Sequence, residues 1–368
     1  MDAIVLGGGL MGTASAFFLA RRGIRVTLIE RGRIGAGATV ASFGNIRRSG
    51  RHLAQLPLAA RSLAIWNQAE TLLGRDVEFR PTGHLRLIFD IDSLNDMRAY
   101  AEAARAQGLS LEELAPAELR TRFPGLGPDA IAASFSPRDG SANPRLISPA
   151  FADAAARAGA SVVEEAPVSD IRTTNAGFEV DTAKGTFRAA TLLNCAGAWG
   201  RAVAARFGED VPLETWGPQM AVTEPLPHRI APVVGVWSRA HGPYLRQVER
   251  GNVVFGGAVD RVRVDAEPGF ASPDPARLPA QVAAVLKLVP ALANVAVIRQ
   301  WSGCEGYVAD ALPVMGASGT TPGLFHAFGF CGHGFQLGPG VGAAMAELIA
   351  TGQCETPLED FAITRFAA

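Results

Sequence analysis

Three glycines near the start of the chain have the spacing of a phosphate-binding turn. Gly7, Gly9 and Gly12 form G-x-G-x-x-G directly after the apolar run 3–6. Gly7 allows a tight turn, Gly9 lets backbone N–H groups approach a pyrophosphate, and Gly12 lets a helix pack closely on a strand. Glu30 ends the next apolar segment and can accept hydrogen bonds from ribose hydroxyls. The pattern predicts a dinucleotide site, and because the acid repels a 2′-phosphate, FAD and NAD remain as candidates.

A second group of reactive side chains is the arginine cluster in GNIRRSGR, residues 44–51. A planar guanidinium can hold a carboxylate through two parallel hydrogen bonds, so Arg48 or Arg51 is a candidate substrate clamp; solvated loop arginines are the alternative. The chain has two lysines, Lys184 and Lys287, and neither lies in a setting that suggests Schiff-base chemistry. No histidine pair has metal-ligand spacing, so we predict no metal.

The spacing of apolar residues and the helix-capping residues predict the strands and helices that position these groups. Residues 3–6 and 25–30 predict buried strands, and the segment from about Leu10 to Arg22, closed by Gly23, predicts the helix between them. Near the other end, 324–330 predicts a strand, and 332–340 predicts a glycine-rich crossing into a helix over 342–352. The strand in 188–197 ends in small residues, which allow a ligand to approach the backbone.

Other segments have the periods of a mixed unit. Residues 57–73 and 93–107 show the apolar spacing of amphipathic helices, and 267–279 is proline-rich and predicts a surface loop. Period-two and β-branched stretches predict strands. These strand segments are 83–89, 219–225, 244–249 and 252–259.

Length and charge set the class of protein. The 368 residues, 48% of them hydrophobic, suffice for about two domains. The net charge of −1 provides no field to attract nucleic acid or a membrane surface, so small molecules are the expected partners. Four cysteines without a C-x-x-C pair favour a reducing cytoplasm. Glycines interrupt the uncharged stretch 3–20, so we expect neither a targeting nor a transmembrane segment.

Four segments in order then resemble the D-amino-acid oxidase type of FAD-dependent oxidoreductases, which includes glycine and sarcosine oxidases. They are RGRIGAGATVASFGNIRRSGR after Glu30, DGSANPRLISPAFADAAARAGASVVEEAPVSDI with LLNCAGAWG, WSGCEGYVADALPVMG, and FGFCGHGFQLGPGVGAAMAELI. The resemblance implies an α/β fold in which a Rossmann-like FAD-binding domain is interleaved with an α+β substrate domain built on a mixed sheet. The implied pieces are 1–50, 140–212 and 302–368 for FAD, and 51–139 and 213–301 for substrate.

The family pattern implies FAD as the cofactor and places Arg47 near its flavin ring. The implied cofactor contacts are Gly7, Gly9, Leu10, Met11, Gly12, Glu30, Arg31, Ala38, Thr39, Ser42, Gly44, Asn45, Arg47, Val168, Cys195, Ala196, Gly197, Trp199, Gly303, Gly332, His333, Gly334, Phe335 and Gln336.

The implied reaction moves a hydride from the carbon next to nitrogen to flavin N5 and leaves an imine. Its substrate would be a small amine or amino acid: a secondary amine, an imino acid such as proline or hydroxyproline, or a D-amino acid. The candidate catalytic residues are Arg47, Arg51, Tyr244, Arg246 and Glu305.

Three positions depart from the family pattern. Gln336 replaces a lysine that holds the carboxylate in sarcosine-oxidase-like members, and Glu305 replaces an arginine of glycine-oxidase-like members. Glu305 can receive a cationic substrate group or pair with Arg246 or Arg299. Val254 stands where oxidases place the lysine that activates oxygen, which favours a dehydrogenase.

Two questions stay open at this point. Residues 45–66 look most like flavin subunits of hydroxyproline, proline and opine dehydrogenases, which implies a possible partner subunit or electron acceptor. The alternatives are therefore an electron-transferring flavin subunit of a heteromeric opine- or sarcosine-type dehydrogenase, and an FAD monooxygenase. Some relatives attach flavin through a cysteine near W-x-G; Cys304 lies beside that position, and a buried structural cysteine is the other interpretation.

Overall fold

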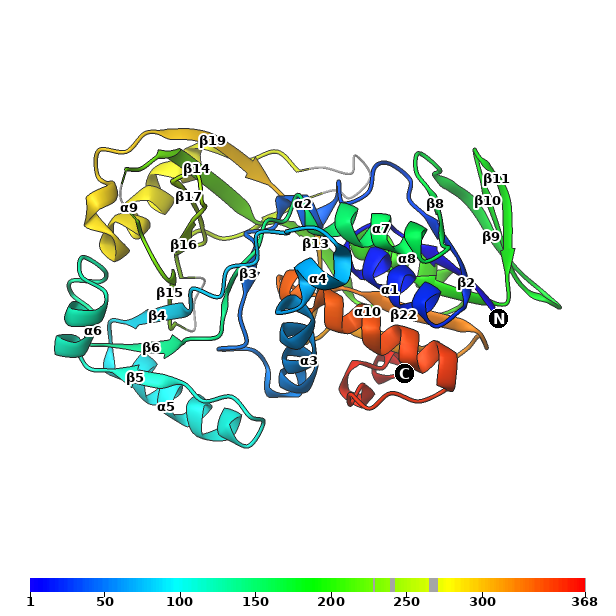
Figure 1. The fold of residues 1–368 in the computed structure, drawn as a ribbon, viewed down its shortest axis with the longest axis horizontal. Coiled ribbons are helices and arrows are strands. Elements are labelled where there is room, and N and C mark those ends of the chain that lie inside the picture. Colours follow the sequence, from blue (N-terminus) through cyan, green and yellow to red (C-terminus); the bar gives the residue numbers. More distant parts are fainter. Residues whose placement is uncertain (228, 239–241, 265–270, 368) are drawn as a thin grey trace.

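A computed structural model describes residues 1–227, 229–238, 242–264 and 271–367. Two lobes lie side by side, each built on its own sheet, and both chain ends belong to the lobe that contains α1 and α10 (Figure 1). The chain crosses repeatedly between the lobes. Each lobe is therefore assembled from segments far apart in the sequence.

Among the described residues, six strands form the sheet of the first lobe in the order β21-β22-β12-β1-β2-β8. Neighbouring strands pair in parallel except β21 with β22. Both faces are covered, which explains the unbroken apolar run of the first strand. The strands are β1 (Asp2–Leu6), β2 (Arg25–Ile29), β8 (Ser161–Val163), β12 (Thr191–Asn194), β21 (Val314–Ala317) and β22 (Leu324–Phe328).

Alternate residues of β1 reach two different layers. Ala3 and Val5 pack into the core under the helices α1 (Leu10–Arg21), α7 (Ile147–Arg157) and α10 (Gly334–Thr351). Ile4 and Leu6 pack on the opposite face against a three-stranded sheet. That sheet has the order β11-β10-β9 and comprises β9 (Val168–Thr174), β10 (Gly177–Thr182) and β11 (Gly185–Ala189).

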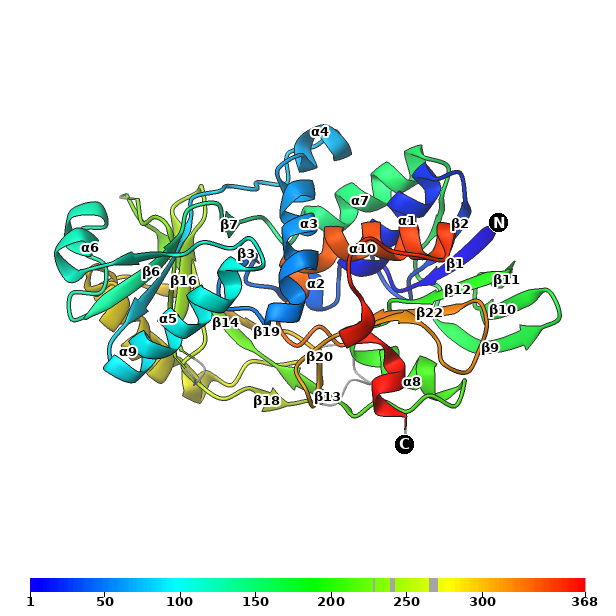
Figure 2. The same cartoon turned by 90° about the horizontal axis from the view of Figure 1, so that it is seen from below.

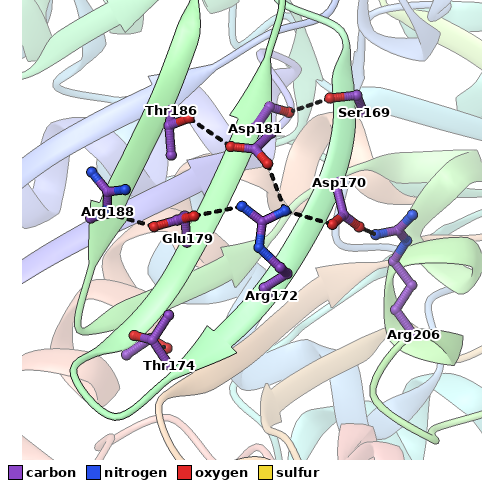
Figure 3. Close-up of polar contacts among 10 residues, drawn as sticks. Ser169, Asp170, Arg172, Thr174, Glu179, Asp181, Thr186, Arg188 and Arg206 are labelled. Carbon is purple, nitrogen blue, oxygen red and sulfur yellow. Dashed lines mark hydrogen bonds and ion pairs between the residues drawn. The ribbon is translucent and has the colours of Figure 1, made fainter.

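The solvent side of this three-stranded sheet carries a network of ion pairs (Figure 3). Arg172 lies between three carboxylates, those of Asp170, Glu179 and Asp181, at 2.5 to 2.8 Å. Asp170 also pairs with Arg206, at 2.6 Å, just after α8 (Gly200–Ala205). The network therefore links β9 to α8, two elements that border the cavity described below.

Helix α10 begins earlier than the sequence suggested. We expected 332–340 to be a crossing segment, but the helix starts at Gly334 and continues through Pro339. Its glycines provide close contact: a Cβ on Gly338 would lie 2.4 Å from Leu10, and one on Gly342 would lie 2.5 Å from the Ala14 carbonyl carbon. These glycines let α10 pack directly on α1, so the glycine-rich pattern reflects helix packing and not a loop.

In the described part of the second lobe, eight strands form a mixed sheet in the order β19-β14-β17-β16-β15-β4-β6-β5. Its core contains Leu85 and Leu87 of β4 with Phe255 of β17. Helices α5 (Ile91–Arg105), α6 (Pro116–Arg122) and α9 (Leu278–Leu288) surround it (Figures 1 and 2). The strands are β4 (His84–Ile88), β5 (Glu112–Leu114), β6 (Ala132–Ser136), β14 (Gln219–Pro225), β15 (Val233–Val236), β16 (Tyr244–Gln247), β17 (Asn252–Gly256) and β19 (Val297–Ser302).

Smaller elements connect the lobes. The sheet β18-β13-β20 and the pair β3-β7 lie between them, together with α2 (Ala38–Ala41). Helix α4 (Ala69–Leu73) packs on α7 in the first lobe (Figure 2). The strands are β3 (Asn45–Ile46), β7 (Gly140–Ser141), β13 (Leu213–Gly217), β18 (Val262–Arg263) and β20 (Glu305–Val308). Short 3-10 turns complete the chain: Leu53–Gln55, Gly197–Trp199, Pro275–Arg277, Pro290–Leu292, Glu359–Phe361 and Ile363–Phe366.

Two helical expectations need revision. The segment 57–73 forms not one helix but two, α3 (Leu56–Trp66) and α4. We grouped 51–139 with the substrate domain, yet α3 packs across α10 of the first lobe (Figure 2). Trp66 Nε1 donates to the Gln336 carbonyl at 2.9 Å, which fixes this contact. Of the expected loop 267–279, residues 267–270 lie outside the described residues, and the remainder ends in the first turn of α9.

Candidate active site

A cavity of about 1070 Å³ runs between the lobes and is lined by residues of both. Small-molecule pockets typically span roughly 300–1,000 Å³, so this space has room for a dinucleotide together with a small substrate. It extends from the G-x-G-x-x-G turn, past the start of α10, to the eight-stranded sheet, where side chains of β4 and β16 line it.

At one end, the glycines make room for backbone contacts. Gly7 has a positive φ of 104°, and a Cβ there would lie 2.4 Å from the Cys195 carbonyl oxygen. A Cβ on Gly12 would lie 1.9 Å from the Gly7 carbonyl oxygen. Gly9 differs, because its nearest neighbour would be Thr39 Oγ1 at 3.6 Å. Gly7 and Gly12 are thus needed for the turn to form, whereas the absence of a side chain at Gly9 leaves the backbone open to the cavity.

The acid that ends β2 is held by backbone amides. Glu30 accepts from Gly8 N–H at 2.6 Å and from Gly32 N–H at 2.7 Å, and it lines the cavity. Nearby, the Arg31 guanidinium stacks over the Trp199 ring at 3.6 Å from its centroid. The carboxylate is thereby positioned in the way that ribose recognition requires.

The start of α10 forms the middle of the cavity wall. His333 precedes the helix, and its Nδ1 is buried without a partner among the described residues. Burial, together with the charges of Arg51 and Arg47, lowers the pKa of His333 well below its usual value, so the ring is neutral. Gln336 donates to Ala59 O at 2.8 Å, while its Oε1 is likewise unpartnered. Two orphaned polar atoms at a helix N-terminus fit a ligand with polar edges.

Beyond α10, Arg47, Arg51 and Arg86 line the cavity, accompanied by His84; Arg51 is buried, and the other two arginines are half-buried. Arg51 donates to Arg47 O at 2.7 Å and to His333 O at 3.3 Å. Arg86 donates to Val236 O through Nε and Nη2, at 3.3 and 3.1 Å. Desolvation, reinforced by the charge of Arg47, lowers the pKa of Arg51 and of Arg86 to about 9. This end of the cavity is strongly electropositive.

Glu305 lies on a different part of the wall, on β20. Its carboxylate accepts from Gly332 N–H at 2.9 Å and from Tyr307 O–H at 3.1 Å. Burial raises its pKa, and the Tyr307 and Gly332 hydrogen bonds and the charge of Arg261 oppose that rise. The nearby cation is thus Arg261, and not Arg246 or Arg299, which we considered as its partners.

The structure brings most of the predicted residues to this one cavity. Arg47, Arg51, Tyr244 and Glu305 line it, as do the predicted cofactor residues other than Gly12 and Gly44. Arg246 lies elsewhere. It donates to Phe43 O at 2.5 Å, and a Cβ on Gly44 would lie 2.7 Å from Arg246 Nη2, so both are engaged in packing between β16 and the segment before β3.

Four other residues considered in the sequence analysis are placed relative to the cavity by the structure. Of the two candidate carboxylate clamps, Arg51 reaches the cavity, whereas Arg48 is buried behind it and donates to Gly108 O at 3.5 Å. Cys304 lines the cavity. Val254 is buried in an apolar cluster with Phe43 and Met220.

Five lining residues that carry a charge or a titratable ring were not predicted from the sequence: His84, Arg86, Arg206, Arg261 and Tyr307. A signal for two of them existed. His84 and Arg86 alternate with Leu85 and Leu87 on β4, and the leucines enter the core of the second lobe. Two polar residues at period two in an otherwise apolar strand mark a polar face.

With this geometry established, comparison identifies the family. Residues 2–348 match the FAD dependent oxidoreductase (DAO) family. The chain belongs to this family, and its cofactor is FAD. The predictions of a D-amino-acid-oxidase-type flavoprotein, of an α/β fold with a Rossmann-like sheet and of FAD as cofactor are confirmed.

The relatives include oxidases and dehydrogenases. Glycine oxidase of Geobacillus kaustophilus is 29% identical over 99% of this chain and 97% of its own. An opine oxidase component of Rhizobium meliloti is 26% identical over 100% and 98%. Dimethylglycine dehydrogenase of Rattus norvegicus is 27% identical over 96% of this chain, which spans only 43% of that protein. These relatives confirm the prediction that the chain is an FAD-dependent amino acid or amine oxidoreductase.

A solved structure agrees closely. L-Proline dehydrogenase from P. horikoshii superposes with a TM-score of 0.92, at 30% identity, over 99% of this chain and 97% of that one. Within the described ranges, no helix combines the length and apolar character needed to cross a membrane. In the same ranges, no group of three His, Cys, Asp or Glu side chains could hold a metal ion.

Proposed function

We propose that this protein oxidises a small amine or amino acid at the carbon next to nitrogen, with the substrate carboxylate held by Arg51. The observation that carries the proposal is the position of Arg51. It is buried on the cavity wall and hydrogen-bonded to the backbone of both Arg47 and His333, beside the segment that the family pattern assigns to the flavin. A fixed guanidinium there can orient a carboxylate, and with it the reacting carbon.

FAD, when bound, accepts the hydride. The Gly7–Gly12 turn and Glu30 would hold its nucleotide part, and the start of α10 with Arg47 would face its flavin ring. The protein must then orient the substrate, exclude water and keep the amine unprotonated. The cations Arg47, Arg51 and Arg86 on the cavity wall favour the neutral amine, because like charges repel an ammonium group.

We further propose that the acceptor is not oxygen. Both lysines of the chain lie away from the cavity, and Val254 stands where oxidases carry a lysine. The relatives include components of sarcosine and opine oxidases that are named as single subunits, which supports a partner subunit that receives the electrons. The proposal includes a location in the cytoplasm, because the spacing of the four cysteines, without a C-x-x-C pair, favours a reducing compartment.

Anaerobic mixing tests the proposal directly. The purified holoprotein is combined with D- and L-proline, hydroxyproline isomers, sarcosine and an arginine-derived opine, and the visible flavin absorbance is followed. Bleaching by at least one amine, with reoxidation faster by an artificial acceptor than by air, is expected. If no amine bleaches the flavin while NAD(P)H does, the protein is a monooxygenase-type enzyme and the proposal is wrong.

A further inference from the structure

The electropositive end of the cavity holds more positive charge than a single carboxylate needs. Arg47, Arg51 and Arg86 all line it, and the neighbouring His84 has a pKa held well below its usual value, first by burial and then by the charges of Arg47 and Arg86. The His84 ring is therefore neutral, so it neither adds to the positive charge of the arginines nor compensates it. The anion that faces Arg47 and Arg51 is Asp139.

Asp139 cannot balance them. It is fully buried, it accepts from Ser49 N–H at 3.2 Å, and it is not part of the cavity wall. Within the described residues, neither Arg51 nor Arg86 forms an ion pair with a carboxylate. Asp139 behind the wall thus faces Arg47 and Arg51, and no carboxylate of the described residues faces Arg86. An unpaired charge held away from water is strongly unfavourable.

The guanidinium groups are fixed but not fully used. Arg86 is held by Val236 O and by the Trp237 ring, 4.1 Å from its Cζ, while its Nη1 has no hydrogen-bond partner in the described part of the chain. Arg51 uses Nε and Nη1 on backbone carbonyls and leaves Nη2 similarly available. Carbonyl oxygens orient a guanidinium without neutralising it. Each group therefore keeps a donor and a full charge for a ligand.

We propose that the substrate carries two carboxylates: an iminodicarboxylic acid, a secondary amine with an acid on each arm, one arm held by Arg51 and the other by Arg86. This inference deepens the proposed function and rests on it. The family pattern assigns Arg47 to the flavin ring, so Arg51 and Arg86 remain at this end of the cavity, and a monocarboxylate would leave one of them unpaired.

The experiment measures binding apart from turnover. Holoprotein is titrated anaerobically with diglycolate, which has two carboxylates joined through an ether, and with methoxyacetate, which keeps the ether and one carboxylate. Neither can be oxidised as an amine, and binding is followed by the perturbation of the flavin spectrum. We expect diglycolate to bind at least tenfold more tightly than methoxyacetate. Equal affinities would overturn the inference.

Variants assign the two arms. Arg86→Met should lower the affinity for diglycolate to that for methoxyacetate and leave methoxyacetate within about threefold, and Arg86→Lys should restore part of the difference. Arg48→Met is the matched control, because it removes a buried cation that does not line the cavity, and it should preserve the preference. If Arg86→Met weakens both ligands equally, both arginines hold the same carboxylate and the inference is wrong.

Turnover separates this inference from the proposed function. With iminodiacetate and sarcosine as a pair that differs by one carboxylate, we expect kcat/KM at least tenfold higher for iminodiacetate. Tight binding of diglycolate without reduction by any amine would contradict the proposed function alone. Reduction by sarcosine and iminodiacetate with similar kcat/KM, and similar binding of the two ethers, would contradict the dicarboxylate inference alone.

Discussion

The two ends of the cavity are built by different means. The nucleotide end consists of backbone: glycines, the start of α1 and an acid held by two amides, all within residues 7–32. The opposite end consists of side-chain charge, and its arginines come from the segment before α3 and from β4.

This difference separates two kinds of recognition. A wall of backbone is sensitive to added volume and almost indifferent to charge, because glycine offers only space and N–H groups. A wall of cations is sensitive to the loss of a single charge, because a guanidinium that binds a ligand carboxylate leaves that carboxylate unpaired when it is removed. Substitutions at the two ends should therefore fail in different ways.

The largest effect is expected at Gly12. Gly12→Val places atoms within 1.9 Å of the Gly7 carbonyl oxygen, so the turn cannot form and both FAD retention and folding should be lost. The matched control is Gly23→Ala at the other end of α1, where φ is 77° and the space is open; a cost of about 1 kcal/mol is expected there. Flavin absorbance per chain and the melting temperature measure both. A yellow, stable Gly12→Val protein would contradict this account.

Gly9→Val separates space for the ligand from space for the fold. Its Cβ would meet only Thr39 Oγ1, at 3.6 Å, so the apoprotein should fold with little change in melting temperature. Affinity for FAD should fall at least a hundredfold, because the side chain occupies the face that the pyrophosphate approaches. Titration of apoprotein with FAD checks this. Wild-type affinity would show that the pyrophosphate lies elsewhere.

At the charged end, Arg51→Met should leave the flavin in place and remove substrate binding. Loss of a buried charged partner costs about 2–5 kcal/mol, which corresponds to roughly thirtyfold to several thousandfold in kcat/KM. Steady-state kinetics with an artificial acceptor measure the change, and flavin content is the internal control. Arg48→Met, also a buried cation, should reduce kcat/KM far less. Equal losses in the two variants would mean that overall field, and not contact, binds the substrate.

A smaller effect is expected from a buried pair outside both ends. Glu209 accepts from His326 Nε2 and Ser318 Oγ at 2.8 Å and from Gly319 N–H at 2.6 Å. Burial raises its pKa, but these hydrogen bonds prevail and lower it below the ordinary 4.5. The stability it contributes is therefore present above about pH 4.5 and is lost as pH falls through its folded pKa.

Glu209→Gln should accordingly reduce the free energy of unfolding by about 1.5–3 kcal/mol near pH 7, with wild-type and variant stabilities converging in acid. Denaturant unfolding at several pH values tests this, with Glu209→Asp as a control that keeps the charge. A difference independent of pH would show that packing, and not the carboxylate, matters.

The smallest effect is expected for the Arg61–Glu347 pair, 2.6 Å apart, between α3 and α10. It is partly exposed, so Arg61→Met should cost at most about 1 kcal/mol and show little change in flavin content. The double variant with Glu347→Gln measures the coupling between the two side chains. A coupling well above this value would indicate that the helix contact depends on charge as well as on its glycines.

Sequence predicted the nucleotide end well because its signals are local. The strand 3–6, the glycine spacing, the helix to about Arg22 and Glu30 are neighbours in the chain, and all reappear in place. The start of α10 was misread, because glycines that allow close helix contact resemble glycines of a loop. Tertiary packing decided between these two interpretations.

The charged end was only half predictable. Arg47 and Arg51 lie in one motif and were found, whereas Arg86 lies in a strand whose partner segments are distant in sequence. Arg246 was assigned to the substrate from the same kind of strand pattern, but it turned to pack against Phe43. Which face of a strand meets a cavity depends on the whole sheet, and one strand cannot reveal it.

The glycine contacts of α10 have a mechanical consequence. Gly338 and Gly342 pack against α1 so closely that neither helix can shift without the other. The first turn of each helix borders the cavity. A shift of the glycine turn that binds the nucleotide would therefore move α1 and, with it, α10. His333 at the start of α10 would move too, and its carbonyl would carry the shift to the Arg51 guanidinium. Loading of the cofactor and alignment of the reactant are in this way two outcomes of a single docking event.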